Sequence, residues 1–237
     1  LSAIVTVADD GGSTGRLRAQ YHIPAMGDIR NVMCAMAESE SLFSTLMNYR
    51  FEGEGNDIGG HNLGNLLLTA LTQNCGSFIE AIQAFSKVMN VKGDIIPSST
   101  EVITLFAVME DGTIVRGESN IPNFNNPISR VFYQSDVQAS AQALKAIHEA
   151  DVIIYGIGSL YTSIMPNLII TGIREELARS SAKKIYFCNA MSQPGETDHY
   201  SLEDHVQAII DHTGPYAVDT DVTIRGDVVV ACDRCLE

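Results

Sequence analysis

Short apolar runs alternate along the chain with longer segments in which apolar residues recur at helical spacing. The runs Ile4–Val7, Val152–Tyr155 and Lys184–Asn189 are rich in β-branched and aromatic residues, which predicts strands buried on both faces. Helical spacing is found over residues 31–37, 42–50, 66–74, 78–89, 138–150, 167–180 and 205–212. This alternation predicts a doubly wound α/β fold with a mostly parallel sheet.

One segment, about residues 93–130, departs from this alternation. The apolar run Val102–Met109 is followed by an Asp111-Gly112 turn and by the second run Ile114–Gly117, which together predict a β-hairpin. The Asn- and Pro-rich stretch Pro122–Pro127 is expected to be a surface loop. We therefore expect a single α/β domain over residues 1–237, with the hairpin as an inserted or edge-strand subdomain.

The composition narrows the classes of partner. The chain has 237 residues, of which 45% are hydrophobic, and a formal net charge of −14. Such a composition excludes a disordered chain, and the negative charge disfavours a general nucleic-acid or anionic-membrane surface. Binding of a phosphorylated small molecule is still compatible with this negative charge, because it requires only a few local hydrogen-bond donors. No apolar run of 18 residues and no signal peptide is seen, so a cytoplasmic protein with no membrane span is expected.

The five cysteines fit a reducing compartment, because their number is odd and their positions are scattered. Cys34, Cys75 and Cys188 lie in apolar contexts that favour buried thiols. Cys232 and Cys235 have CxxC spacing, but no second pair or neighbouring histidine completes a zinc site. A structural role and a metal or redox role therefore both stay open for this pair.

The first apolar run ends in a polar, glycine-rich turn. Glycines let the backbone bring its N–H groups close to a ligand, and hydroxyl and guanidinium groups add donors suited to phosphate oxygens. The alternative is an ordinary turn, since Asp and Gly are common in such turns. The candidate ligand-binding residues in this turn are Asp9, Asp10, Gly11, Gly12, Ser13, Gly15 and Arg16.

Two further clusters precede helical segments. Asp28, Arg30 and Asn31 open one helix, and His61 and Asn65 stand at the start of another. Backbone N–H groups at a helix start are unsatisfied and attract anions, so both clusters are candidate ligand-binding sites. Asp28 could instead cap its helix, and His61 could be a satisfied core histidine.

The strand Val152–Tyr155 also runs into a glycine turn that carries hydroxyl groups, and the last strand ends in the polar loop 189–197. In open α/β sheets, ligands bind at the carboxyl ends of the strands, so these loops are expected to face the same crevice as the first turn. A plain strand-to-helix turn is the alternative. The candidates here are Gly156, Gly158, Ser159, Tyr161, Asn189 and Thr197.

The segments VTVADDGGSTGRLR, GDIRNV, GHNLGNLLL, GSLYTSIMPNL and NAMSQPGET resemble the YvcK/CofD-like family, in the form found in its YvcK branch, the gluconeogenesis factors. The likeness covers the chain up to about His212 and implies a Rossmann-like fold. Family members usually begin with a strand and a GGGTG loop, so we expect a natural N-terminal strand and loop before Leu1. Ile157 stands where the family usually has proline, and the likeness fades beyond about Asp219.

The resemblance implies two functions. The YvcK branch implies a nucleotide-sugar-binding regulator, needed for growth on gluconeogenic carbon sources and for cell shape, with no catalysis required. The CofD branch implies a 2-phospholactate transferase that acts on a deazaflavin with Mg²⁺. In that alternative Asp28 is the catalytic residue, and Asp10 and Asp28 are the metal ligands. The expected partners are a phosphorylated small molecule and, as an open possibility, a second copy of the chain.

Overall fold

The computed structural model describes residues 1–38, 41–53, 57–124 and 126–219. Cys232 and Cys235 lie outside these residues. The strands are β1 (Ser2–Val5), β2 (Asp94–Pro97), β3 (Phe106–Met109), β4 (Ile114–Arg116), β5 (Ile128–Phe132), β6 (Val152–Tyr155) and β7 (Lys183–Tyr186). The helices are α1 (Gly12–Tyr21), α2 (Gly27–Met36), α3 (Ser41–Asn48), α4 (Leu63–Cys75), α5 (Phe78–Val88), α6 (Ala141–His148), α7 (Met165–Leu168), α8 (Thr171–Arg179) and α9 (Leu202–Thr213), with a 3₁₀ helix η1 (Glu118–Asn123) and a π-helical turn η2 (Leu160–Ile164).

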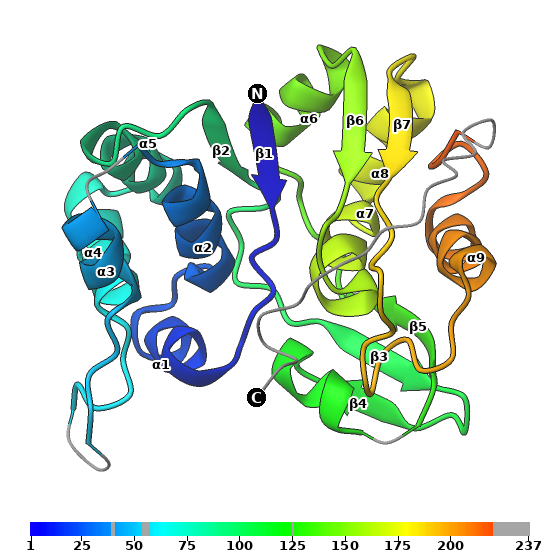
Figure 1. The fold of residues 1–237 in the computed structure, drawn as a ribbon, viewed down its shortest axis with the longest axis horizontal. Helices are drawn as coiled ribbons and strands as arrows, with labels where there is room; N and C mark the ends of the chain where they lie inside the picture. The colour runs from blue at the N-terminus through cyan, green and yellow to red at the C-terminus, as the bar shows by residue number, and fades with distance from the viewer. Residues whose placement is uncertain (39–40, 54–56, 125, 220–237) are drawn as a thin grey trace.

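Parallel strand pairs and surrounding helices confirm the α/β class. β1 pairs with β2, and β6 pairs with β7, both in parallel. In the described residues these are separate two-stranded sheets, so β1 and β6 each pair along one edge. Figure 1 shows α1 to α5 gathered on one side of β1, whereas α6 to α9 lie on the other side with β6 and β7.

The predicted hairpin is confirmed, and it belongs to a larger antiparallel sheet. β3 pairs with β4 across the Asp-Gly turn, and β5 pairs with the other edge of β3. The sequence missed β5. The boundary of the subdomain also changes, because β2 lies within residues 93–130 but belongs to the parallel pair with β1. The expected loop Pro122–Pro127 begins inside η1, where Pro122 is accommodated in the 3₁₀ turn.

Two predicted strands end earlier than expected. The first ends at Val5, although Val7 and Ala8 are fully buried, and the last ends at Tyr186, which leaves Asn189 in a loop. An apolar run reports burial, and burial does not require pairing in a sheet. Cys34, Cys75 and Cys188 are free and half-buried rather than fully buried.

The predicted helix over residues 167–180 is two helices. α7 ends at Leu168, and Ile170 has an extended backbone (φ −66°, ψ 121°) that interrupts the helical hydrogen bonding before α8 begins. The amphipathic helix at residues 78–89 is confirmed: Phe78, Ile82 and Phe85 of α5 are buried at helical spacing. Apolar periodicity therefore located the helices from α2 onward, but it missed α1 and did not show where the backbone breaks.

Loop 189–197 packs directly on η1 through Gly195. The backbone of Gly195 has φ +79°, and a Cβ there would overlap the carbonyl oxygen of Pro122. This close approach joins the segment after β7 to the antiparallel sheet.

Replacing Gly195 by alanine is expected to lower the melting temperature by more than about 4 °C, which corresponds to more than about 2 kcal/mol for a chain of this size. Gly112→Ala is the matched control, because Gly112 also has positive φ but has no atom within 4 Å of the added Cβ. It should cost only about 1 kcal/mol, the strain of the left-handed backbone. Equal shifts of the two melting temperatures, measured by circular dichroism, would contradict the packing of Gly195 on Pro122.

Candidate functional site

The loop after β1 is held by a buried arginine that the sequence did not single out. Arg18 is 6% exposed, and its guanidinium donates to the carbonyl oxygens of Ala8 (3.1 Å), Asp9 (2.6 Å) and Ile103. Burial lowers the pKa of Arg18, and the nearby carboxylates of Asp10 and Asp9 oppose that shift. The arginine thus fixes the backbone from which the two aspartates project.

The two aspartates of this loop have different surroundings. Asp9 Oδ1 accepts from the backbone N–H of Gly11 at 2.9 Å. Asp10 Oδ1 accepts from both the backbone N–H (3.0 Å) and the hydroxyl (2.9 Å) of Ser119 in η1. A Cβ on Gly15 would overlap the carbonyl oxygen of Asp10, so glycine is required there. Asp10 therefore ties the loop to the antiparallel sheet, while Asp9 shapes the turn.

The starts of α1 and α4 meet at the buried hydroxyl of Ser13. This oxygen lies 3.0 Å from His61 Nδ1 and accepts from the backbone N–H of Asn62 at 3.1 Å. Asn65 Nδ2 approaches it at 3.4 Å and the Thr14 hydroxyl at 3.3 Å. Burial and the charge of Arg16 lower the pKa of His61, so its neutral form is favoured. His61 therefore positions Ser13.

Arg30 of α2 is largely satisfied by protein acceptors. Its Nε donates to Asn65 Oδ1 at 3.1 Å, and its terminal nitrogens donate to the Met47 carbonyl (3.3 Å), to Asn48 and to Asn31 Oδ1 (2.7 Å). A guanidinium has five N–H groups, and these four acceptors leave about one of them for a ligand. The positive charge of Arg30 is also available to a ligand. Arg30 thus joins α2, α3 and α4 around a common centre.

A cavity of about 270 Å³ lies at this centre. Its lining residues are Asp9, Gly11, Gly12, Ser13, Thr14, Gly27, Arg30, Asn31, Arg50 and Asn65. Neither α1 nor α2 has a side chain that caps its N-terminus, so their first-turn N–H groups have no capping acceptor. Free N–H groups at helix starts and adjacent arginines make a site for an anion such as phosphate.

The sequence predicted seven of these lining residues, and it missed Thr14, Gly27 and Arg50. Gly27 is needed because a Cβ would lie 2.6 Å from Asp9 Oδ2 and 2.7 Å from the Thr14 hydroxyl. Arg50 donates to the Gly60 carbonyl at 2.8 Å and is otherwise exposed at the rim. It follows α3 in a segment without a motif, so only the fold brings it to the cavity.

Five other predicted residues lie beside the cavity without lining it. These are Asp10, Gly15, Arg16, Asp28 and His61. Arg16 donates to the Gly59 carbonyl at 2.7 Å. Asp28 stands in the first turn of α2, where burial, followed by the charge of Asp9, raises its pKa to about 6.

The second predicted loop is closed by a carboxylate of the protein itself. Glu196 is 6% exposed and accepts from the backbone N–H of Tyr161 (3.3 Å) and from the Thr162 hydroxyl (2.9 Å). Burial raises the pKa of Glu196, and these hydrogen bonds oppose the shift. The start of η2 is therefore already occupied by an anion.

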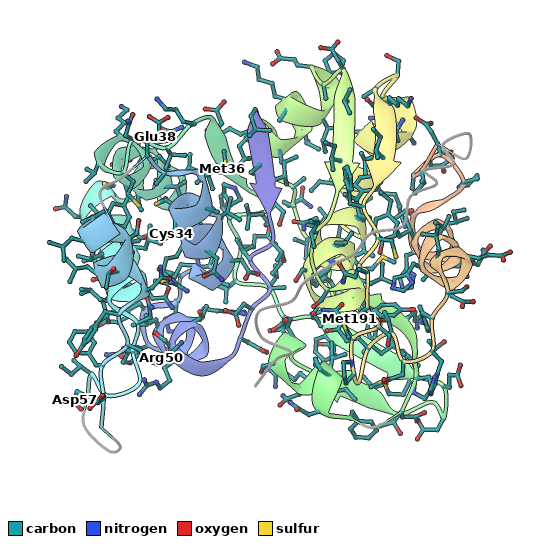
Figure 2. The ribbon with its side chains drawn as sticks, in the orientation of Figure 1. Cys34, Met36, Glu38, Arg50, Asp57 and Met191 are labelled. Carbon is teal, nitrogen blue, oxygen red and sulfur yellow. The ribbon has the colours of Figure 1, made fainter. Side chains whose placement is uncertain are left out.

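The polar groups around Glu196 bond to one another. Asn189 donates to the Gly158 carbonyl at 3.0 Å, and Gln193 donates to the Ser159 hydroxyl at 2.7 Å. Thr197 is fully buried and accepts from the Gln193 backbone N–H. The predicted residues of these two loops line neither the cavity at the starts of α1 and α2 nor the larger cavity described below. They are Gly156, Gly158, Ser159, Tyr161, Asn189 and Thr197. Figure 2 shows Arg50 and Met191, of loop 189–197, in opposite halves of the molecule.

Glu118 lies between the two loops and was not predicted. Burial raises its pKa to about 8, and the carboxylates of Asp9, Asp28, Asp10 and Glu196 add to the shift in that order. A carboxyl group with such a pKa is largely protonated at neutral pH. It follows Gly117 at the end of β4, where no sequence motif marks it.

Within the described ranges, no three His, Cys, Asp or Glu side chains are grouped so that they could hold a metal ion. None of the helices in the part of the chain that the structure covers is long and apolar enough to cross a membrane.

Comparison with known proteins gives consistent matches over nearly the whole chain. The family model described as 2-phospho-L-lactate transferase CofD matches residues 1–234. A protein of Halalkalibacterium halodurans named "Gluconeogenesis factor" is 50% identical over 230 residues, which are 97% of this chain and 71% of that protein. A Bacillus subtilis protein of the same name is 48% identical over 96% of this chain and 72% of its own length.

Solved structures give the same result. A crystal structure of a Bacillus halodurans protein superposes with a TM-score of 0.89 at 52% identity, and covers 92% of this chain and 70% of that chain. A second crystal structure from the same organism gives a TM-score of 0.88. These matches confirm the resemblance to the YvcK/CofD-like family that the sequence motifs indicated.

Replacing Glu118 by glutamine is expected to change how stability depends on pH. At pH values between the ordinary pKa of 4.5 and the raised pKa of about 8, Glu118 stays protonated in the folded chain, whereas in the unfolded chain it has released its proton. The free energy of unfolding should therefore fall as pH rises through this window, and Glu118→Gln should remove that part of the fall. Urea unfolding at about pH 5, 7 and 9 measures it, with exposed Glu110→Gln as the control. Parallel pH profiles for wild type and Glu118→Gln would contradict the assignment.

Replacing Arg18 by lysine is expected to destabilise the protein by about 3 kcal/mol, because a single ammonium cannot serve three carbonyls held by a planar fork. Arg116→Lys is the control, since Arg116 is exposed on β4. Urea unfolding of both variants at neutral pH is the measurement. A loss for Arg18→Lys no larger than for Arg116→Lys would show that the loop does not depend on the guanidinium.

Proposed function

We propose that this chain, which belongs to the CofD family, is a regulatory protein of the gluconeogenesis-factor type that binds a nucleotide sugar through its phosphates. The names of the relatives from Halalkalibacterium halodurans and Bacillus subtilis support the type of protein. Ligand binding would connect the protein to growth on gluconeogenic carbon sources and to cell shape, the roles that the family resemblance implies.

The observation that carries this proposal is the cavity at the starts of α1 and α2. Its uncapped N-terminal turns supply backbone donors, Arg30 and Arg50 supply positive charge, and Asn31 and Asn65 supply amide groups. This donor set matches the oxygens of a diphosphate. Asp9, which also lines the cavity, would repel an anion unless it accepts from a sugar hydroxyl or binds a cation.

The volume of the cavity limits which part of the ligand lies inside it. Pockets that enclose drug-sized ligands usually have about 300–1,000 Å³. The cavity, at about 270 Å³, is below this range and fits a diphosphate better than a whole nucleotide sugar. We propose that the phosphates lie in the cavity and that the base lies outside it.

A magnesium ion is compatible with the site if the ligand supplies most of its coordination. Mg²⁺ is usually held by one or two carboxylates together with substrate phosphates. Asp9 and Asp28 would be the protein ligands, because Asp10 Oδ1 already accepts two hydrogen bonds from Ser119. With its pKa raised to about 6, Asp28 would be ionised and able to bind a cation only above that pH.

A second candidate function is the CofD-type transfer of a phospholactyl group to a deazaflavin alcohol. The match to the transferase family model favours it, and so does Asp28. A carboxylate with a pKa of about 6 is suited to accept a proton from an alcohol near neutral pH. In this alternative Asp28 is the general base, and the cavity holds the phosphate of the donor.

Calorimetric titration with UDP-glucose, with and without Mg²⁺, tests the main proposal. We expect saturable binding to the wild type, and about tenfold weaker binding to Arg50→Gln because one positive charge at the rim is lost. Arg116→Gln, which removes an exposed charge that does not belong to the cavity lining, should bind as the wild type does. Absence of binding, or equal affinity of Arg50→Gln and wild type, would overturn the proposal.

Asp28→Asn separates the two candidate functions. The main proposal expects the variant to bind UDP-glucose with altered affinity, and no product to form from GDP-linked donor and deazaflavin even with wild type. The alternative expects wild-type turnover with Mg²⁺ that Asp28→Asn abolishes. Product formation by the wild type, followed by chromatography, would replace the regulator with the transferase.

A further inference from the structure

A second, larger cavity lies on the other half of the molecule, away from the loops that the sequence singled out. It has a volume of about 600 Å³ and is lined by the following residues: 129–137 of β5 and the segment after it, Ile169, Thr171, Arg174, Asp211 and His212. β5 is an edge strand, since it pairs only with β3 in the described residues. The cavity therefore lies between the edge strand β5, the start of α8 and the end of α9.

Two arginines line this cavity with no protein acceptor assigned to them. Neither Arg130 nor Arg174 has a hydrogen-bonded or ion-paired acceptor in the described part of the chain. Five other arginines do have such partners: Arg16, Arg18, Arg30, Arg50 and Arg179. The guanidinium carbon of Arg130 lies 5.0 Å from the centre of the Phe132 ring, which orients the group without neutralising it.

The start of α8 adds donors to the same cavity. The described N-termini of α4, α5, α6 and α9 are each capped by a side chain. α8 has no such cap and no acidic residue in its first turn, and its first residue, Thr171, lines the cavity together with Arg174 one turn later. Backbone donors and a guanidinium therefore approach the cavity from one helix.

The lining also contains two carboxylates, whose formal charge equals that of the two arginines. The carboxylates of Asp136 and Asp211 are exposed and accept from Gln138 (3.2 Å) and Gln207 (2.7 Å). His212 Nε2 accepts from the Val131 backbone N–H at 3.1 Å, so its Nδ1 carries the proton that is donated to the Ala208 carbonyl at 2.7 Å. This histidine is neutral and fixed, and it closes the strand edge at the floor of the cavity.

We propose that this cavity is a second ligand site, for a small phosphate ester that binds through Arg130, Arg174 and the N-terminal turn of α8. Its volume lies within the range typical of pockets for small molecules, so it fits a sugar phosphate or a nucleoside monophosphate. The site is separate in residues from the cavity at α1 and α2. A second metabolite would bind the same protein at this site.

The test is a calorimetric titration of the full chain with three probes: inorganic phosphate, glucose 6-phosphate and uridine monophosphate. At least one ester is expected to bind the wild type below about 1 mM and to bind Arg130→Gln/Arg174→Gln at least tenfold more weakly. Arg116→Gln is the control, and it should keep the wild-type affinity. Equal affinity for inorganic phosphate and the esters would contradict an ester site, because the rest of the ligand would then contribute nothing.

Nuclear magnetic resonance locates the binding independently. The backbone amide signals of Val131 and Thr171 should shift on saturation with the bound ester, and should not shift in the double variant. Binding that is lost in Arg50→Gln but kept in the double variant would place the ester in the first cavity and overturn the proposal. Absence of saturable binding of all three probes to the wild type would overturn it as well, whatever the result with UDP-glucose.

Discussion

The guanidinium of Arg18 fixes the geometry on which the site depends. By donating to the carbonyls of Ala8, Asp9 and Ile103, it holds the loop after β1 against a segment 85 residues later in the chain. The loop therefore leaves β1 in a fixed direction, and α1 begins where the loop ends. Asp10 projects from this backbone and accepts a hydrogen bond from Ser119. One buried guanidinium therefore holds the loop from which α1 begins, and Asp10 connects this loop to η1.

The charge of the site is less negative than its residue types suggest. Asp9 lines the cavity that we propose to bind phosphate, and Asp28 and Glu118 are close enough to Asp9 to interact with its charge, in a chain whose net charge is −14. Glu118, whose pKa is raised to about 8 by burial first and by the neighbouring carboxylates second, is mostly neutral at pH 7. The uncapped starts of α1 and α2 add partial positive charge that no sequence count includes. Burial and backbone dipoles thus account for the anion site that we propose in a chain of acidic composition.

Local patterns predicted most of the elements, but not α1, β2 or β5, and they predicted the first half of the site. Val152–Tyr155 was predicted with its observed bounds, and the turn from Asp9 to Ser13 and the starts of α2 and α4 come together as their motifs indicated. Interactions between segments that are distant in the chain could not be predicted from the sequence. Nothing around Ile103 marks it as a partner of Arg18, and nothing near Glu118 indicates its neighbours. The expected single domain, the expected strand before Leu1 and the expected Mg²⁺ stay predictions.

The second glycine loop shows why a motif can resemble a phosphate site and work differently. Its donors are arranged as such a site requires, but the N–H of Tyr161 and the hydroxyl of Thr162 already bind the Glu196 carboxylate, which comes from the loop after β7. A ligand phosphate at that place would have to displace a buried group and meet its charge. The backbone of Gly156–Ser159 is the part of the loop that stays outside this interaction. We therefore expect any contact of a ligand with the second loop to be made at Gly156–Ser159, whereas Tyr161 holds the loop to Glu196.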